Sequence, residues 1–190
     1  MTFEDSRYDR VAITLHWLLA LGLLAQIALG FWMIDIPKLP AGVRAYWFNL
    51  HKSIGLTLAA LIVVRLLWRV VRRPPPLPAT LPRWQRLAAG ASHGLLYLCM
   101  VALPLSGYLG STFSGYPIRY FGLTLPNWGG KDEALKELLS TVHWTAAWLL
   151  VLLIGLHVAA ALRHRLARDG LFERMWPVGR SAARPSITGR

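Results

Sequence analysis

Six histidines lie within or at the ends of long apolar stretches of this chain: His16, His51, His93, His143, His157 and His164. Imidazole binds haem iron and exchanges a proton near neutral pH, so these residues are suited to redox chemistry or proton transfer. A single membrane histidine is often only an interhelical hydrogen-bond partner. Six of them in four apolar segments indicate a functional constellation, because ionisable groups in a membrane are costly and usually have a partner or a role.

Depth in the membrane decides which histidines can meet. His143 and His157 are 14 residues apart, which is about 21 Å along a helix and close to four turns, so both face the same way near opposite surfaces. The economical pairing is His16 with His157 for an inner haem and His51 with His143 for an outer haem. Iron held by two histidines has no open position, which favours electron transfer over oxygen binding. We therefore predict two b-type haems.

The ligand set excludes several other chemistries. Cys99 is the only cysteine, so the chain has no intrachain disulfide and no Cys-x-x-Cys-His attachment for c-type haem. It has no His-Glu-x-x-His motif and no cysteine-histidine cluster for zinc, and His143 and His157 are too far apart to share one ion. The glycines Gly22, Gly55 and Gly155 lie near the ligand positions, where they would let a macrocycle approach the backbone; ordinary helix packing explains them equally well.

Two histidines are left for other roles. His164 lies seven residues beyond His157, about two turns further on nearly the same face. It is a candidate to hydrogen-bond a quinone at the inner membrane boundary, and the alternative is an interfacial side chain. His93 is a second quinone candidate or a haem-propionate partner, and the alternative is helix packing beside Gly90 and Gly94.

The elements that must position these histidines are membrane helices. The chain is 55% hydrophobic with a mean hydropathy of +0.41, and a span needs about 20 apolar residues. We predict an all-α, four-helix transmembrane bundle in residues 1–177, with a basic cytoplasmic tail in residues 178–190. The net charge of +12 does not indicate nucleic-acid binding, because the cations flank the apolar runs. The predicted spans are Val11 to Met33, Phe48 to Val71, Leu87 to Gly110 and Leu138 to Leu166.

The connections give the orientation. Arginines surround the proline-rich second connection and follow the fourth span, whereas the cations of the opposite side are diluted by acidic residues. Because cytoplasmic loops carry the excess of Lys and Arg, both termini are predicted to be cytoplasmic, in a multi-pass protein of the bacterial inner membrane. The segment from Ser111 to Lys136 is rich in Gly, Pro and aromatic residues, and we expect it to cap one end of the bundle.

Several motifs occur together along the chain and resemble the bacterial cytochrome b561 family from about Tyr8 to Pro177. The matching stretches are ITLHWLL, NLHKSIG, VVRLLWR, SHGLLYL, ALPLSGYL, RYFGLTLP and HWTAAWLLVLLIGLHVAAALRH. The same ligand scheme occurs in the cytochrome b subunits of formate dehydrogenases and nickel-iron hydrogenases. The FGLTLP stretch favours the stand-alone family.

The resemblance implies a small cytochrome that takes electrons on the outer face and delivers them to ubiquinone. One characterised member is a superoxide oxidase. In that scheme superoxide, a small-molecule donor, meets the outer haem near Lys52, Arg119 and Lys136, and His164 occupies the position of the quinone-contacting histidine. Two alternatives stay open. One is the membrane subunit of a dehydrogenase or hydrogenase with a redox partner subunit, and the other is a haem-free proton-relay or transport bundle.

Overall fold

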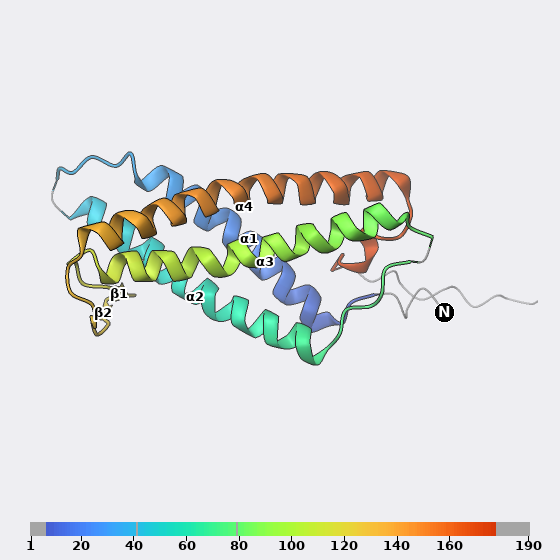
Figure 1. Cartoon of the computed structure of the whole chain (residues 1–190), viewed down its shortest axis with the longest axis horizontal. Coiled ribbons are helices and arrows are strands. Elements are labelled where there is room, and N and C mark those ends of the chain that lie inside the picture. Colours follow the sequence, from blue (N-terminus) through green and yellow to red (C-terminus); the bar gives the residue numbers. More distant parts are fainter. Residues whose placement is uncertain (1–6, 41, 79, 178–190) are drawn as a thin grey trace, which may run out of the picture.

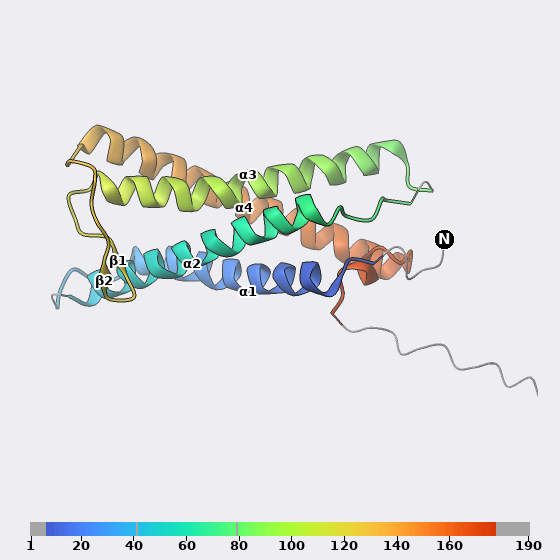
Figure 2. The same cartoon turned by 90° about the horizontal axis from the view of Figure 1, so that it is seen from below.

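The computed structural model describes residues 7–40, 42–78 and 80–177. Four long helices run side by side: α1 (Arg10–Met33), α2 (Val43–Val71), α3 (Arg83–Thr112) and α4 (Glu133–Ala167) (Figures 1 and 2). All four are long and apolar enough to cross a membrane. The predicted all-α bundle of four spans is therefore confirmed.

The helices begin earlier than the predicted spans. α2 begins at Val43 rather than Phe48, and α4 begins at Glu133 rather than Leu138. The difference arises because the apolar runs mark only the hydrocarbon-crossing part, whereas polar first turns outside it are also helical. The Asp132 carboxylate accepts a hydrogen bond of 3.0 Å from the backbone N–H of Leu135 and so caps the polar start of α4.

The bundle consists of two helix pairs. α1 packs along α2 and α3 packs along α4, whereas α4 has no extended backbone packing with α1 or α2 in the described chain. Each pair also has its own apolar cluster: the first contains Leu19, Leu58 and Ile62, and the second contains Cys99, Leu150 and Leu153. Between α4 and α1 the contacts are made by side chains, among them Leu23 and Ile27 against the second cluster and Phe31 against Trp148.

One end of the bundle, which we call the terminal end, holds both described ends of the chain (Figure 1). The Tyr8 N–H donates to the Arg174 carbonyl at 3.3 Å, and the Trp17 indole N–H donates to the Met175 carbonyl at 2.8 Å. Arg174 belongs to the short 3-10 helix η2 (Phe172–Arg174) and is only 5% exposed. It donates to the carbonyls of Pro75 and Pro76, so it fastens the chain after α4 to the α2–α3 connection. The predicted tail of residues 178–190 lies outside the described residues.

The opposite end, which we call the hairpin end, carries strands β1 (Arg119–Tyr120) and β2 (Leu123–Thr124), paired antiparallel. Phe121 and Gly122 at the turn both have positive φ, as a tight hairpin requires. The Ser53 hydroxyl of α2 donates to the Arg119 carbonyl and accepts from the Phe121 N–H at 2.9 Å. The expected cap over this end is thus a hairpin fastened to α2 (Figure 2).

Candidate functional site

Two histidine pairs connect α4 with the first helix pair. At the terminal end, the ring centroids of His16 on α1 and His157 on α4 are 6.2 Å apart. At the hairpin end, those of His51 on α2 and His143 on α4 are 6.3 Å apart. The structure therefore brings together the same pairs that depth along the sequence predicts.

The ring separations fit one metal ion between each pair. An imidazole nitrogen binds a metal at about 2.0–2.1 Å and lies about 1.1 Å from its ring centre, so two opposed rings on one ion have centroids about 6.3 Å apart. Within the described residues, no group of three or more His, Cys, Asp or Glu side chains could hold an ion alone. Each pair thus suits an ion whose remaining ligands come from a prosthetic group, as in bis-histidine haem.

Glycines face the imidazoles at the hairpin end. A Cβ at Gly30 would lie 3.1 Å from Cε1 of His51, and a Cβ at Gly107 would lie 3.1 Å from Cε1 of His143. Neither glycine was among the candidates from the sequence, because nothing in the local pattern marks which helix face meets an imidazole. Both positions keep the ligand side chains close to the helix backbone.

The three glycines expected near a macrocycle have other surroundings. A Cβ at Gly22 would meet Leu58 at 2.7 Å, and one at Gly55 would meet the Gln26 amide at 3.2 Å, so both serve packing between α1 and α2. A Cβ at Gly155 would meet nothing within 4 Å. Ordinary helix packing, the alternative interpretation, therefore describes the first two.

The His143 ring is held in one tautomer. Its Nδ1 lies 2.9 Å from the Leu103 carbonyl and 3.2 Å from the Ser106 hydroxyl, which itself donates to the Ala102 carbonyl. A carbonyl oxygen only accepts, so Nδ1 carries the proton and Nε2 is left free for a metal. These partners come from the ALPLSGYL stretch of α3, whose role sequence reasoning did not assign.

His51 has a less complete set of hydrogen bonds. Its Nδ1 and the Gln26 Oε1 are both buried without a hydrogen-bond partner among the described residues. The Gln26 amide donates to the His51 carbonyl at 2.7 Å and thereby ties α1 to the turn of α2 that carries the ligand. Unsatisfied buried polar atoms are rare in folded proteins and gather at functional sites.

Arg65 on α2 is the partner of His16. Its Nη1 donates to the Ala12 carbonyl at 3.1 Å, and its Nη2 lies 3.5 Å from the Nδ1 of His16. The guanidinium carbon is 6.0 Å from the ring centroid of Tyr97 on α3. Sequence reasoning missed this residue, although a cation inside a predicted span is the signal that could have found it.

The two quinone candidates have different surroundings. The ring of His93 lies 5.4 Å from that of His157, and its Nδ1 is 2.6 Å from the Ala89 carbonyl. A Cβ on Gly90 or Gly94 would meet nothing within 4 Å, so these glycines mark no close helix packing. His164 instead pairs with Asp169 at 2.5 Å just beyond the end of α4.

The candidate cations for an anionic donor gather at the hairpin end. Lys52 is half-buried directly after His51 in α2, and Arg119 is exposed on β1. The Arg119 carbonyl accepts from Ser53, the residue that follows Lys52, so the hairpin brings Arg119 close to the start of α2. Lys136 is 3.9 Å from Glu133, so its charge is partly compensated.

Comparison with known proteins identifies the family of this chain. The family model described as prokaryotic cytochrome b561 matches residues 7–178. The chain belongs to this family. It is 37% identical to "Cytochrome b561 homolog 2" of Escherichia coli over 96% of this chain and 98% of that protein. It is 28% identical to "Cytochrome b561 homolog 1" of the same organism, over 90% of this chain and 98% of that protein.

A further relative carries an activity in its name. "Probable superoxide oxidase CybB" of Yersinia pestis is 26% identical, over 90% of this chain and 96% of that protein. Cytochromes b561 are membrane proteins that bind haem b, so this chain is a multi-pass bacterial membrane cytochrome b with haem b as its prosthetic group.

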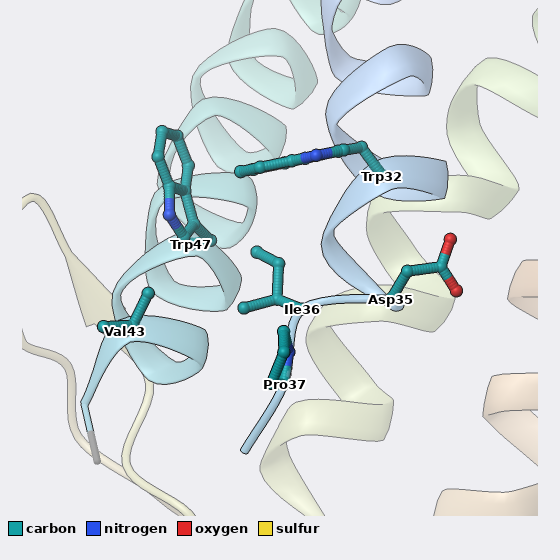
Figure 3. Close-up of a pocket in the computed structure, with 6 residues that line it drawn as sticks. All are labelled: Trp32, Asp35, Ile36, Pro37, Val43 and Trp47. Atoms are coloured by element: carbon teal, nitrogen blue, oxygen red, sulfur yellow. The ribbon is translucent and has the colours of Figure 1, made fainter. Parts of the chain in front are cut away.

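A cavity of about 280 Å³ in this b561 cytochrome lies between the end of α1 and the start of α2, and its lining residues include no histidine. Trp32 and Trp47 line it with ring centroids 4.9 Å apart, and the Asp35 carboxylate points away from both rings (Figure 3). Tryptophans at helix ends are typical of the membrane interface. The cavity is therefore a feature of the bundle surface and not part of the haem site.

Proposed function

We propose that this cytochrome holds two haem b groups and passes electrons from superoxide at the hairpin end to ubiquinone at the terminal end. The observation that carries the proposal is the pair of histidine couples at opposite ends of the bundle, with ring centroids 6.2 and 6.3 Å apart. Haem b, when bound, supplies one-electron redox chemistry at each couple.

The chain's own residues hold and orient the two groups. His16 and His157 would hold the group at the terminal end, and His51 and His143 would hold the group at the hairpin end. The Leu103 carbonyl supports this assignment, because it keeps the Nε2 of His143 unprotonated and available. With two histidines to hold it, each group would be suited to electron transfer and not to oxygen binding.

The hairpin end is proposed to face the periplasm across the inner membrane. Support comes from the arginines of the terminal end, which is the side that the positive-inside rule assigns to the cytoplasm. In the described chain most of them lie at the end of α2, in the α2–α3 connection, at the start of α3 and at the end of α4: Arg69, Arg72, Arg73, Arg83, Arg86, Arg163, Arg165 and Arg168.

Superoxide suits the hairpin end as an electron donor. It is an anion, and Lys52 follows His51 directly while the Arg119 backbone is held to Ser53 on the same helix, so the two cations would steer it electrostatically towards this end. The name of the Yersinia relative supports the same substrate. Two superoxide ions give up two electrons and leave as two molecules of oxygen, without proton uptake.

Ubiquinone is the proposed acceptor at the terminal end, where it takes up those two electrons with two protons. His164 is the proposed hydrogen-bond partner of a quinone carbonyl, and Asp169 holds its imidazole at the surface of the bundle. An imidazole at this boundary could both donate a hydrogen bond to a quinone and pass on a proton. His93, which lies against His157, is the second candidate.

Stopped-flow mixing of the oxidised, purified protein with superoxide tests this function. After mixing with superoxide, the haem absorbance should change from the oxidised to the reduced spectrum. Added ubiquinone should restore the oxidised spectrum. A haem-loaded protein that superoxide does not reduce would overturn the donor assignment, and a co-purifying catalytic subunit would then favour the dehydrogenase-subunit alternative. Absence of haem absorbance would favour the proton-relay or transport alternative.

A further inference from the structure

We infer that Arg65 makes the terminal-end couple the higher-potential redox site, because it holds a positive charge against the His16 imidazole. The inference rests on the proposed function, since it concerns the haem that this couple would hold. It gives electrons a preferred direction, from the hairpin end to the terminal end.

The Arg65 charge lies inside the bundle and not in a surface ion pair. Arg65 is half-buried in α2, and its Nη1 and Nη2 reach the Ala12 carbonyl and the Nδ1 of His16. Arg65 takes part in none of the side-chain ion pairs of the described residues. A guanidinium stays charged in proteins and has only donors, so His16 faces a fixed cation and no acceptor on this side.

The hairpin-end couple has the opposite kind of partner. The His143 Nδ1–H donates to the Leu103 carbonyl at 2.9 Å. An acceptor of this kind makes the imidazole more basic, and a more basic ligand favours the oxidised metal. Lys52 adds positive charge near His51, but no hydrogen bond of the described residues joins its ammonium to either imidazole of the couple.

The Arg65 charge at one couple and the carbonyl acceptor at the other act in the same direction, whereas the Lys52 charge, which has no hydrogen bond to the His51 couple, acts against them. A cation near a redox site favours the form that carries the extra electron, and this effect is stronger in a membrane interior than in water. The carbonyl acceptor at the other couple favours the form without that electron. An electron that reaches the hairpin end therefore gains stability by moving to the terminal end, where ubiquinone is proposed to bind.

Redox titration of the purified protein, followed by haem absorbance, tests this inference with three variants. Arg65→Gln removes the charge and keeps an amide donor for the Ala12 carbonyl, whereas Arg65→Lys keeps the charge. Arg69→Gln is the matched control, because Arg69 lies over the same Tyr97 ring at 5.4 Å, whereas the cation 3.5 Å from the Nδ1 of His16 is Arg65. Each variant is also made with His51→Ala, so that only the terminal-end haem is measured.

Arg65→Gln should lower the midpoint potential of the terminal-end haem by about 59 mV or more, which is a tenfold change in a one-electron equilibrium. Arg65→Lys should retain most of the wild-type potential, and Arg69→Gln should shift it much less than Arg65→Gln. An unchanged potential in Arg65→Gln, or an equal shift in Arg69→Gln, would overturn the inference.

The outcomes separate this inference from the proposed function. A wild-type protein without haem contradicts the proposed function. A haem-loaded protein whose terminal-end midpoint potential is the same in wild type and Arg65→Gln contradicts the inference alone. If Arg65→Gln does not retain haem, the midpoint potentials of the wild type and of His51→Ala still test the inference. The haem that His51→Ala retains must be the one with the higher potential, and the reverse order overturns the inference.

Discussion

The Nδ1 of His164 lies 2.5 Å from the Oδ2 of Asp169, across the left-handed turn at Arg168 that ends α4. The second carboxylate oxygen of Asp169 accepts from the Leu171 N–H at 3.1 Å. Burial raises the pKa of Asp169, but the hydrogen bonds from His164 and Leu171 and the charge of His164 outweigh it and leave the pKa below its ordinary value. The pair thus fixes the last imidazole of α4 at the terminal end.

Asp169→Asn should lower the thermal stability of the protein near neutral pH. A carboxylate whose pKa is lowered by folding stabilises the fold above its unfolded pKa of about 3.9 and loses this effect as pH falls through its folded pKa. The difference in melting temperature between wild type and variant should therefore be constant above about pH 5 and fade below about pH 3.9. Because the pair is partly exposed, the effect on the free energy of unfolding should stay within about 1 kcal/mol.

Glu137→Gln, at the opposite end of α4, is the control. A difference in melting temperature between wild type and Asp169→Asn that grows towards low pH would contradict the lowered pKa of Asp169.

His164→Ala should slow the reoxidation of the haems by added ubiquinone, because the quinone would lose its proposed hydrogen-bond partner. Haem content and the rate of reduction by superoxide should stay near wild type. Stopped-flow absorbance measures both rates in one preparation. A loss of haem would mean that His164 is a ligand, and unchanged reoxidation would make His93 the better quinone candidate.

His51→Ala or His143→Ala should remove one haem and leave the other, since each would take away an axial ligand of the hairpin-end couple only. Pyridine haemochrome analysis should then fall from two haems per chain to one. His16→Ala should remove the other haem and should therefore leave a different absorbance maximum or potential. One haem or none in the wild type would show that the ligand scheme is wrong.

Gly107→Ala should weaken haem binding at the hairpin end. The new methyl group would lie 3.1 Å from His143 Cε1 and 3.2 Å from its Nδ1, and the hydrogen bond to Leu103 prevents the ring from moving aside without cost. Overpacking of this kind costs roughly 1–3 kcal/mol. Gly94→Ala in the same helix meets nothing within 4 Å and should bind haem normally. Equal haem content in both variants would show that the contact is unimportant.

The rate of haem reduction by superoxide should fall as salt is added, because Lys52 and Arg119 are proposed to steer an anion. Screening acts over a Debye length of roughly 8 Å at physiological ionic strength. Lys52→Gln with Arg119→Gln should lower the rate at low salt and flatten its salt dependence. Lys38→Gln, in the exposed α1–α2 connection, should change the rate little. Steering at these two residues is excluded if the double variant keeps the wild-type rate and salt dependence.

The sequence alone determined the number of spans and which histidines share a depth. Both follow from local rules: a span needs about 20 apolar residues, and the rise of a helix converts residue spacing into distance along its axis. His16 therefore had to lie at the depth of His157, and His51 at the depth of His143, for any lateral arrangement of the helices. The helix starts at Val43 and Glu133 were missed because hydropathy marks the membrane and not the helix.

Only the tertiary structure decided what stands beside each imidazole. Whether Arg65 or a lipid faces His16 depends on how α2 is rotated against α1, and whether Gly107 meets His143 depends on how α3 crosses α4. Such rotations arise from the packing of whole helix faces, which no local spacing contains. The same holds for Arg174, which the sequence presents as one more arginine after α4 and the fold buries against Pro75 and Pro76, far away in the chain.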